Sequence, residues 1–462
     1  MEIYLYTFTM KKLTRREKWV YGSGDLGISL TLTIISAYFA IFLTDVVGIR
    51  ASVGAIAIAI GLHWDYINDL FIGHISDRTR SRWGRRRPFL LFGALPFAIF
   101  FALMWWLPPI ANKITLVVYY AVIYVLFEAA ATFVYMPYMA LTPELTQDYD
   151  ERTSISTTRM FFSIVGSLVA FTVPLMIVDG FRSEHASRVL VMGVTFAIVS
   201  AMPLLLVFFG THERLEFMQQ EQPSLRQSIR AVRGNRPFFF GLGIYLFTWV
   251  SFSILQVMLL YFIKYVVQRE AQSDLIMATI FVVAIIALPF WERVSHRLNK
   301  RLAYIIGISF WAVVQLFLVS LNPSTSLPLL LSMCVLAGIG VGAAHILPWS
   351  IMPDAIEWGE WQTGERHEGV FYSLITLLQK VASSMAVPLA LLVLDFTGYV
   401  PNSTQQPASV VSGIRMLTGP VPAALLCMGI LFASLYPLGR ENYNQLAKDL
   451  EARRVAKSKD TP

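Results

Sequence analysis

Long apolar blocks separated by short polar stretches make up most of this chain. A helix needs about 20 mostly apolar residues to cross the roughly 30 Å hydrocarbon layer of a bilayer, and twelve blocks of about that length occur in the 462 residues. The pattern predicts an all-α membrane protein with twelve transmembrane helices, at residues 27–46, 52–73, 88–107, 115–141, 160–178, 189–210, 237–263, 274–291, 302–321, 327–350, 369–395 and 418–437.

Composition and charge agree with a membrane location. Only 15% of the residues are charged and 56% are hydrophobic, whereas a soluble domain has about 25% charged residues. The net charge is +7, and most Lys and Arg fall in the loops on one side, which the positive-inside rule assigns to the cytoplasm. We therefore expect a multi-pass protein of the cell (inner) membrane with both termini cytoplasmic, and no nucleic-acid partner.

The chain divides into two similar halves. Pro143-Glu144 near the end of the fourth block has a counterpart in Pro353-Asp354 near the end of the tenth, roughly 210 residues later. Two related six-helix halves with a binding site between them are a known transporter plan. We predict two pseudo-symmetric bundles, 27–210 and 237–437, with a cytoplasmic N-terminal segment 1–26, a cytoplasmic linker 211–236 and a cytoplasmic tail 438–462.

Two carboxylates lie one helical turn apart in the second block. Asp65 and Asp69 share one helix face, and acids inside the membrane mark ion or substrate sites. A hard cation prefers several oxygen ligands, to which the amide of Asn68 could contribute. The pair could instead hold a proton, since burial and a neighbouring like charge favour the protonated form. We predict a Na⁺ or H⁺ site here; a structural pair satisfied by a neighbouring base is the alternative.

Lys380 is a basic residue well inside the eleventh block. A lysine at that depth needs a partner, and it lies too far from the block ends to reach the interface easily. We expect it to pair with Asp65 and Asp69, occupying the acidic site when no cation is bound.

Other polar and aromatic residues inside the blocks are candidates for substrate contact. Glu128 could bind a substrate hydroxyl, pair with Arg159 or carry a proton; a structural acid with one basic neighbour is equally compatible. Tyr135, Tyr138 and Trp349 flank prolines and could stack on a sugar ring, although packing against lipid or core is commoner.

Two further residues have a preferred structural interpretation. His345 is more often a packing residue than a substrate ligand in such a context. Asp25 is expected to cap the first transmembrane helix, with lining of the inner vestibule as the alternative.

A basic loop follows the second block. Asp77 could pair with its arginines and cap the next helix, while arginines such as Arg78 and Arg85 anchor at headgroups. Asp354, Glu357 and Glu360 lie at the corresponding place in the second half. We predict ion pairs between the halves here that open and close as a gate.

Several segments resemble the glycoside–pentoside–hexuronide:cation symporters, a branch of the major facilitator superfamily that includes the melibiose permeases. They are YGSGDLG (21–27), TDVVGI (44–49), WDYINDLFIGHISDRTRSRWGRRRP (64–88), MPYMALTPEL (136–145), DERTSISTTR (150–159), LPWSIMPDAIEWGEWQTGERHEGVFYS (347–373) and LLQK (377–380). The resemblance implies a twelve-helix fold and alternating access. It places Asp65 and Asp69 on the family's cation-site acids, Lys380 on its lysine, and Arg159 at or beside an arginine that supports sugar binding.

The chain departs from the melibiose-type members at three positions. Their sugar-binding aspartates correspond to Ser29 and Tyr135, and their aromatic residue near the sugar corresponds to His345. The resemblance therefore implies a substrate other than a simple galactoside.

We predict a secondary active transporter, a monomer that moves a small-molecule substrate, expected to be a sugar or glycoside, by symport with Na⁺ or H⁺ through alternating access. A carrier of a non-sugar amphiphile such as a lysolipid is the alternative, and a transport-dead sensor is a weaker one. We expect no enzymatic activity, no cofactor other than the coupling ion, and no metal site beyond Na⁺ at Asp65 and Asp69.

Overall fold

The computed structural model describes residues 13–146, 149–213, 232, 234–363, 368–401, 403, 405–439, 443, 445–446 and 448–450. Each predicted transmembrane block falls on a helix. The elements of the first half are α1 (Arg15–Ile34), the π-helical turns η1 (Ile35–Phe39) and η2 (Phe42–Val46), α2 (Ala51–Arg78), α3 (Arg87–Met104), α4 (Lys113–Leu145), α5 (Tyr149–Val178) and α6 (Ala186–Gly210). Those of the second half are α8 (Arg236–Tyr261), the π-helical turn η5 (Phe262–Val266), α9 (Ser273–Arg297), α10 (Lys300–Leu318), α11 (Leu327–Thr363), α12 (Glu368–Phe396), α13 (Ala408–Thr418) and α14 (Pro420–Ser434).

Ten helices in the described part of the chain are long and apolar enough to cross a membrane. The other two predicted spans are α1, which continues through η1 and η2 to Val46, and α2, whose apolar part runs over Ala51–Asp65.

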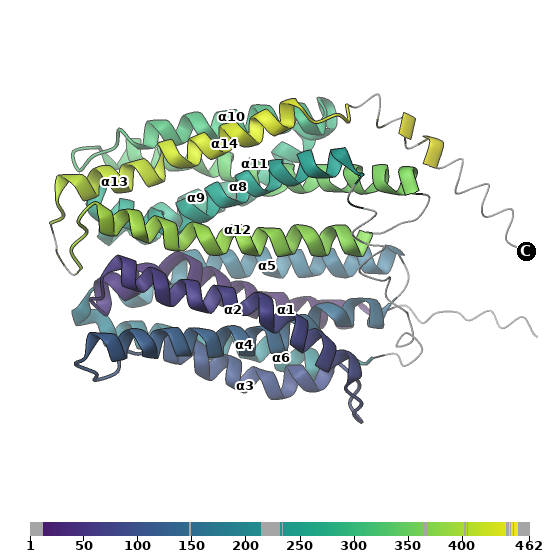
Figure 1. Cartoon of the computed structure of the whole chain (residues 1–462), viewed down its shortest axis with the longest axis horizontal. Helices are drawn as coiled ribbons and strands as arrows, with labels where there is room; N and C mark the ends of the chain where they lie inside the picture. The colour runs from purple at the N-terminus through teal and green to yellow at the C-terminus, as the bar shows by residue number, and fades with distance from the viewer. Residues whose placement is uncertain are drawn as a thin grey trace, which may run out of the picture.

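The helices form two packed layers, one from each half of the chain (Figure 1). Within the first layer α1 packs on α5 and α6, and within the second α9 packs on α11. The layers meet where α12 lies against α2, and α5 against α9. The start of α1 and the end of α14 lie at the same end of the bundle, which we call the terminal end (Figure 1). We call the opposite end the distal end.

The first helix begins earlier than the hydropathy pattern predicts. Thr14 accepts a hydrogen bond from the amide of Glu17, and the Glu17 carboxylate accepts one from the amide of Thr14. This reciprocal capping box fixes the helix start at Arg15. The predicted cap at Asp25 is therefore wrong, because Asp25 lies well inside α1.

The predicted linker 211–236 and the predicted terminal segments lie partly outside the described residues, so those domain boundaries stay predictions. At the last block the helix is interrupted at Gly419, which separates α13 from α14.

A glycine permits close packing of α1 on α6. A Cβ atom built on Gly27 would lie 2.1 Å from the carbonyl oxygen of Ser200. Gly54 in α2 has more space, because its nearest neighbour would be a Leu43 side-chain atom at 3.7 Å. Small residues of this kind let membrane helices approach closely.

We expect Gly27→Ala to separate α1 from α6 and to destabilise the protein by about 1–3 kcal/mol. The control Gly54→Ala adds the same methyl group without a clash and is expected to be neutral or stabilising by up to ~1 kcal/mol. The apparent melting temperature in detergent measures both variants. Equal melting temperatures for the two would contradict the close approach.

Candidate functional site

Helices α2 and α12 bring two acids and one base together at the interface between the halves. The Lys380 ammonium lies 2.8 Å from Oδ2 of Asp65 and 2.8 Å from Oδ2 of Asp69. Because the acids are four residues apart on one helix face, one lysine from the facing helix reaches both. The predicted pairing is confirmed, whereas a role in cation binding stays a prediction.

Neutral oxygens surround this cluster. The Thr132 hydroxyl of α4 donates to Oδ1 of Asp65 over 3.0 Å, and the buried Asn68 donates to the carbonyl of Ala129 over 3.3 Å. Within the described part of the chain, Oδ1 of Asp69 is buried without a hydrogen-bond partner. An unpaired buried carboxylate oxygen is costly, and a cation or a proton would satisfy it.

The charge of the cluster also favours a cation. With both carboxylates and the lysine ionised, Asp65, Asp69 and Lys380 sum to one negative charge. No group of three or more His, Cys, Asp or Glu side chains suited to a metal ion occurs among the described residues. A bound Na⁺ would therefore depend on the two carboxylates together with neutral oxygens such as the Thr132 hydroxyl.

Glu128 lies beside this cluster on α4. Its side chain is 6% exposed, hydrogen-bonds with Tyr124 and interacts electrostatically with Asp65 and Lys380. The proposed pairing with Arg159 is wrong, since Arg159 binds another acid. Glu128 belongs to the surroundings of the acid pair.

A second buried ion pair joins α1 and α5. Nε of Arg159 donates to Oδ2 of Asp25 over 2.6 Å, and the guanidinium lies 5.3 Å from the ring centroid of Tyr138. Tyr138 is fully buried and stacks on Tyr21, which confirms the core-packing interpretation for this tyrosine. Asp25 thus holds the arginine in place.

Two positions singled out by the family comparison flank this pair. The Ser29 hydroxyl lies 2.7 Å from that of Ser163 in α5. Tyr135 interacts electrostatically with both ion clusters, through Asp25 and Arg159 on one side and Lys380 on the other. Tyr135 therefore lies near both the ion pair of α1 and α5 and the acids of α2.

Aromatic side chains gather at the middle of the second half. The ring of His345 meets Trp249 at 5.4 Å and Phe252 at 4.7 Å, both edge to face. Trp349 contacts Tyr245 in the same manner at 4.9 Å. Nε1 of Trp249 is buried and has no partner among the described residues, so this cluster offers a donor together with apolar ring faces.

At the terminal end, Asp354, Glu357 and Arg85 of the predicted gate bind partners within their own halves. Asp354 binds Lys300 of its own half, and Glu357 accepts a hydrogen bond from Tyr443 over 2.8 Å. Arg85 binds Glu144 of the first half. In this state Asp354 and Arg85 thus bind partners of their own halves, and ion pairs between Asp354 and the basic loop in another state stay a prediction.

Arg78 and Asp77 also belong to the predicted gate. Arg78 is the exposed last residue of α2, and the side chain of Asp77 lies outside the described residues. The capping role predicted for Asp77 therefore stays a prediction, and sequence reasoning missed another acid at the start of α3. The Glu213 carboxylate accepts the backbone amides at the start of α3, from Arg85, Arg86 and Arg87, as expected for an acid at a helix N-terminus.

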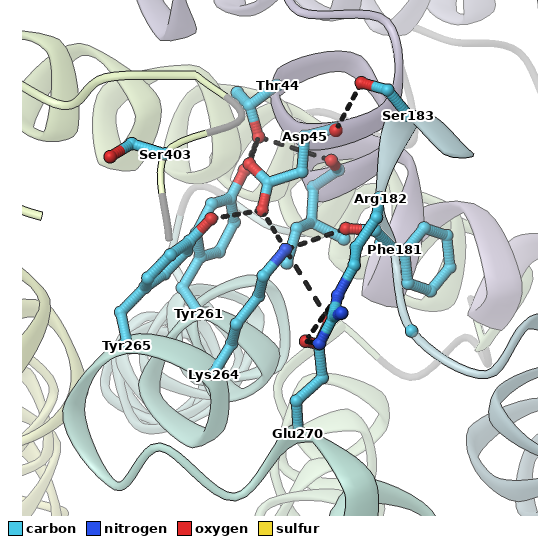
Figure 2. A network of polar contacts seen from close by, with 12 residues as sticks. Thr44, Asp45, Phe181, Arg182, Ser183, Tyr261, Lys264, Tyr265, Glu270 and Ser403 are labelled. Atoms are coloured by element: carbon cyan, nitrogen blue, oxygen red, sulfur yellow. Dashed lines mark hydrogen bonds and ion pairs between the residues drawn. The ribbon is translucent and has the colours of Figure 1, made fainter. Parts of the chain in front are cut away.

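Sequence reasoning also missed Asp45 (Figure 2). It belongs to η2, which follows α1 at the distal end. It is 1% exposed and binds Lys264 of the other half over 2.5 Å. Two signals were available: an acid at the end of an apolar block, which is common at a helix terminus, and the place of Asp45 in the segment TDVVGI (44–49), which shares the family resemblance.

A family model described as MFS/sugar transport protein matches residues 20–440. The chain belongs to this family. The resemblance to the glycoside–pentoside–hexuronide:cation symporters is thereby confirmed. The MFS/sugar transport proteins are transporters and not enzymes, so this protein is a symporter of the major facilitator superfamily that crosses the membrane several times.

Relatives within the family have different substrates in their names. An uncharacterized symporter of Synechocystis sp. is 30% identical over 97% of this chain and 98% of its own length. The sodium-dependent lysophosphatidylcholine symporter 1-A of Danio rerio is 28% identical over 96% of this chain and 89% of its own. The isoprimeverose transporter of Lactiplantibacillus pentosus is 26% identical over 94% of this chain and 91% of its own.

The fold is also found among solved structures. The crystal structure of a D-xylose-proton symporter aligns with a TM-score of 0.66 and 15% identity, covering 91% of this chain and 96% of that one. At that identity the match supports the major facilitator fold of this MFS/sugar transport protein, and no more.

Proposed function

We propose that this symporter couples the movement of Na⁺ or H⁺ to uptake of a sugar or glycoside by alternating access. In this proposal Asp65 and Asp69 form the cation site, and the protein works as a monomer in the cell (inner) membrane. The terminal end faces the cytoplasm, as the positive-inside rule predicts.

One observation carries the proposal: Lys380 of the second half bridges both acids of the first half at 2.8 Å. The three groups keep one net negative charge, so an entering cation is attracted and competes with the ammonium for the carboxylate oxygens. Neutralising the acids weakens the contact between α2 and α12. Binding of the ion is thereby linked to the relative position of the two halves.

Polar and aromatic groups near this site suit a hydroxylated substrate. Arg159, oriented by Asp25, and Tyr135 provide hydrogen-bonding groups in the first half. His345 and Trp349 belong to the aromatic cluster of the second half, where ring faces can stack on a sugar. The isoprimeverose transporter among the relatives supports a sugar or glycoside as the substrate class.

A lysolipid is the second candidate. A relative with 28% identity over 96% of the chain is a lysophosphatidylcholine symporter by name. The aromatic cluster around Trp249 and Phe252 would suit an acyl chain as well as a sugar ring, and Arg159 would suit a phosphate group.

Uptake by the purified protein in proteoliposomes tests these proposals. Labelled xylosides, other glycosides and lysophosphatidylcholine are compared under an inward Na⁺ gradient at equal pH, and under an inward proton gradient without Na⁺. We expect sugar or glycoside uptake above the empty-liposome level with one of the two gradients. Uptake of lysophosphatidylcholine alone would establish the second candidate, and uptake unaffected by either gradient would overturn cation coupling.

A further inference from the structure

The two halves carry matching π-helical turns at the distal end. η2 (Phe42–Val46) follows α1, and η5 (Phe262–Val266) follows α8, the first helix of the second half. In each turn, the amide after the last residue bonds back to the carbonyl of the first residue over 3.0 Å. Such wide turns occur often at functional positions, and here both face the interface between the halves.

Asp45 of η2 is bound by donors from the opposite half. Its Oδ2 accepts from the Lys264 ammonium and from the Tyr265 hydroxyl, both of η5. Its Oδ1 accepts from the Tyr399 hydroxyl, beyond the end of α12, and from its neighbour Thr44 over 3.0 Å. Both carboxylate oxygens are therefore satisfied largely across the interface.

Lys264 is held in the same place by further groups (Figure 2). It donates to the carbonyl of Phe181 in the first half over 2.7 Å and lies 3.6 Å from Glu270. Glu270 in turn accepts from Arg182 of the first half over 2.8 Å. This hydrogen bond raises the pKa of Arg182, so the guanidinium stays charged.

The burial of Asp45 makes this network sensitive to the relative position of the halves. With the side chain 1% exposed, the negative charge depends on its partners rather than on water. Removing one partner of a buried ion pair is strongly unfavourable because the remaining charge is uncompensated. Separation of the distal ends must therefore break the network and hydrate Asp45 at the same time.

We propose that Asp45, Lys264, Tyr265 and Tyr399 form a latch between the two π-helical turns that holds the distal end shut. In this state substrate cannot enter from the distal side. The latch is distinct from the acid pair in α2, since it involves other helices and lies at the end of the bundle. Opening of the distal end requires the latch to separate.

Distance measurement between spin labels tests the latch on the full chain without substrate or ion gradient. Labels are placed at the distal end of each half by Lys113→Cys and Ser324→Cys, in a background with Cys334→Ser and Cys427→Ser. We expect a single short distance for the parent protein. Asp45→Asn and Lys264→Met should each add a longer-distance population and raise the ratio of open to closed by at least about tenfold.

A matched control and a milder variant complete the experiment. Arg50 also pairs across the halves, with Asp395 at 3.5 Å, but its side chain is 74% exposed; Arg50→Gln should leave the distances unchanged. Tyr399→Phe removes only one hydroxyl and should give a smaller shift in the same direction, which provides the result if Asp45→Asn does not fold. Unchanged distances in Lys264→Met and Tyr399→Phe would overturn the latch, whether or not the protein transports sugars.

Discussion

Replacing Asp69 by asparagine is expected to weaken cation-stimulated uptake strongly by lowering the affinity for the coupling cation. The variant keeps the shape of the side chain but removes the net negative charge that remains when Lys380 is bound. Truncating one partner of a buried charge pair typically costs at least ~2 kcal/mol, so the apparent cation affinity should fall by at least about 30-fold. The cation concentration that gives half-maximal uptake in proteoliposomes measures this change.

Asp395→Asn is the matched control for this experiment. Asp395 lies on α12. Like Asp69 it pairs across the halves, but with the exposed Arg50 at 3.5 Å, and exposed pairs contribute little. We expect its cation dependence to equal that of the parent protein. If Asp69→Asn kept the parent's cation dependence, coupling through the acid pair of α2 would be refuted.

Replacing Arg159 by methionine is expected to lower stability and to remove substrate binding. Asp25 is 8% exposed and would keep a charge without its partner, a situation that costs about 3–5 kcal/mol. The apparent melting temperature in detergent measures the loss of stability. Binding of the transported substrate by isothermal calorimetry measures the loss of recognition.

The double variant Asp25→Asn with Arg159→Met separates these two effects. Without the uncompensated acid, the melting temperature should recover most of the loss, because a buried pair replaced on both sides is often nearly neutral. Substrate binding should stay absent, since the guanidinium is missing. Recovery of binding in the double variant would show that Arg159 has only a structural role.

The fold followed from hydropathy because the bilayer demands apolar helices of a fixed length. The pairing of Lys380 with Asp65 and Asp69 could also be predicted, since an amine that deep in the membrane requires an acid. Both inferences depend on the cost of charge in hydrocarbon, which is high enough to leave few alternatives.

Local and long-range polar contacts were harder to predict. The start of α1 had a signal in Thr14 and Glu17, whose spacing is that of a capping box, yet apolar content alone placed the helix start near Asp25. The partners of Asp45 and Glu213 come from segments distant in sequence, and an acid near a helix end has many possible partners. The gate predicted at Asp354 stays a prediction: in this state Asp354 binds Lys300, and sequence alone could not distinguish Lys300 from the arginines of the other half as its partner.

The single uncompensated charge shared by Asp65, Asp69 and Lys380 has an electrical consequence for the proposed cycle. A carrier loaded with one monovalent cation and a neutral sugar is neutral at this site, whereas the empty carrier is negative. The membrane potential then acts on the return of the empty carrier, with about 2.3 kcal/mol per 100 mV for one full charge. Transport of a neutral sugar should be electrogenic, and an inside-negative voltage should accelerate turnover by driving the unloaded site outward.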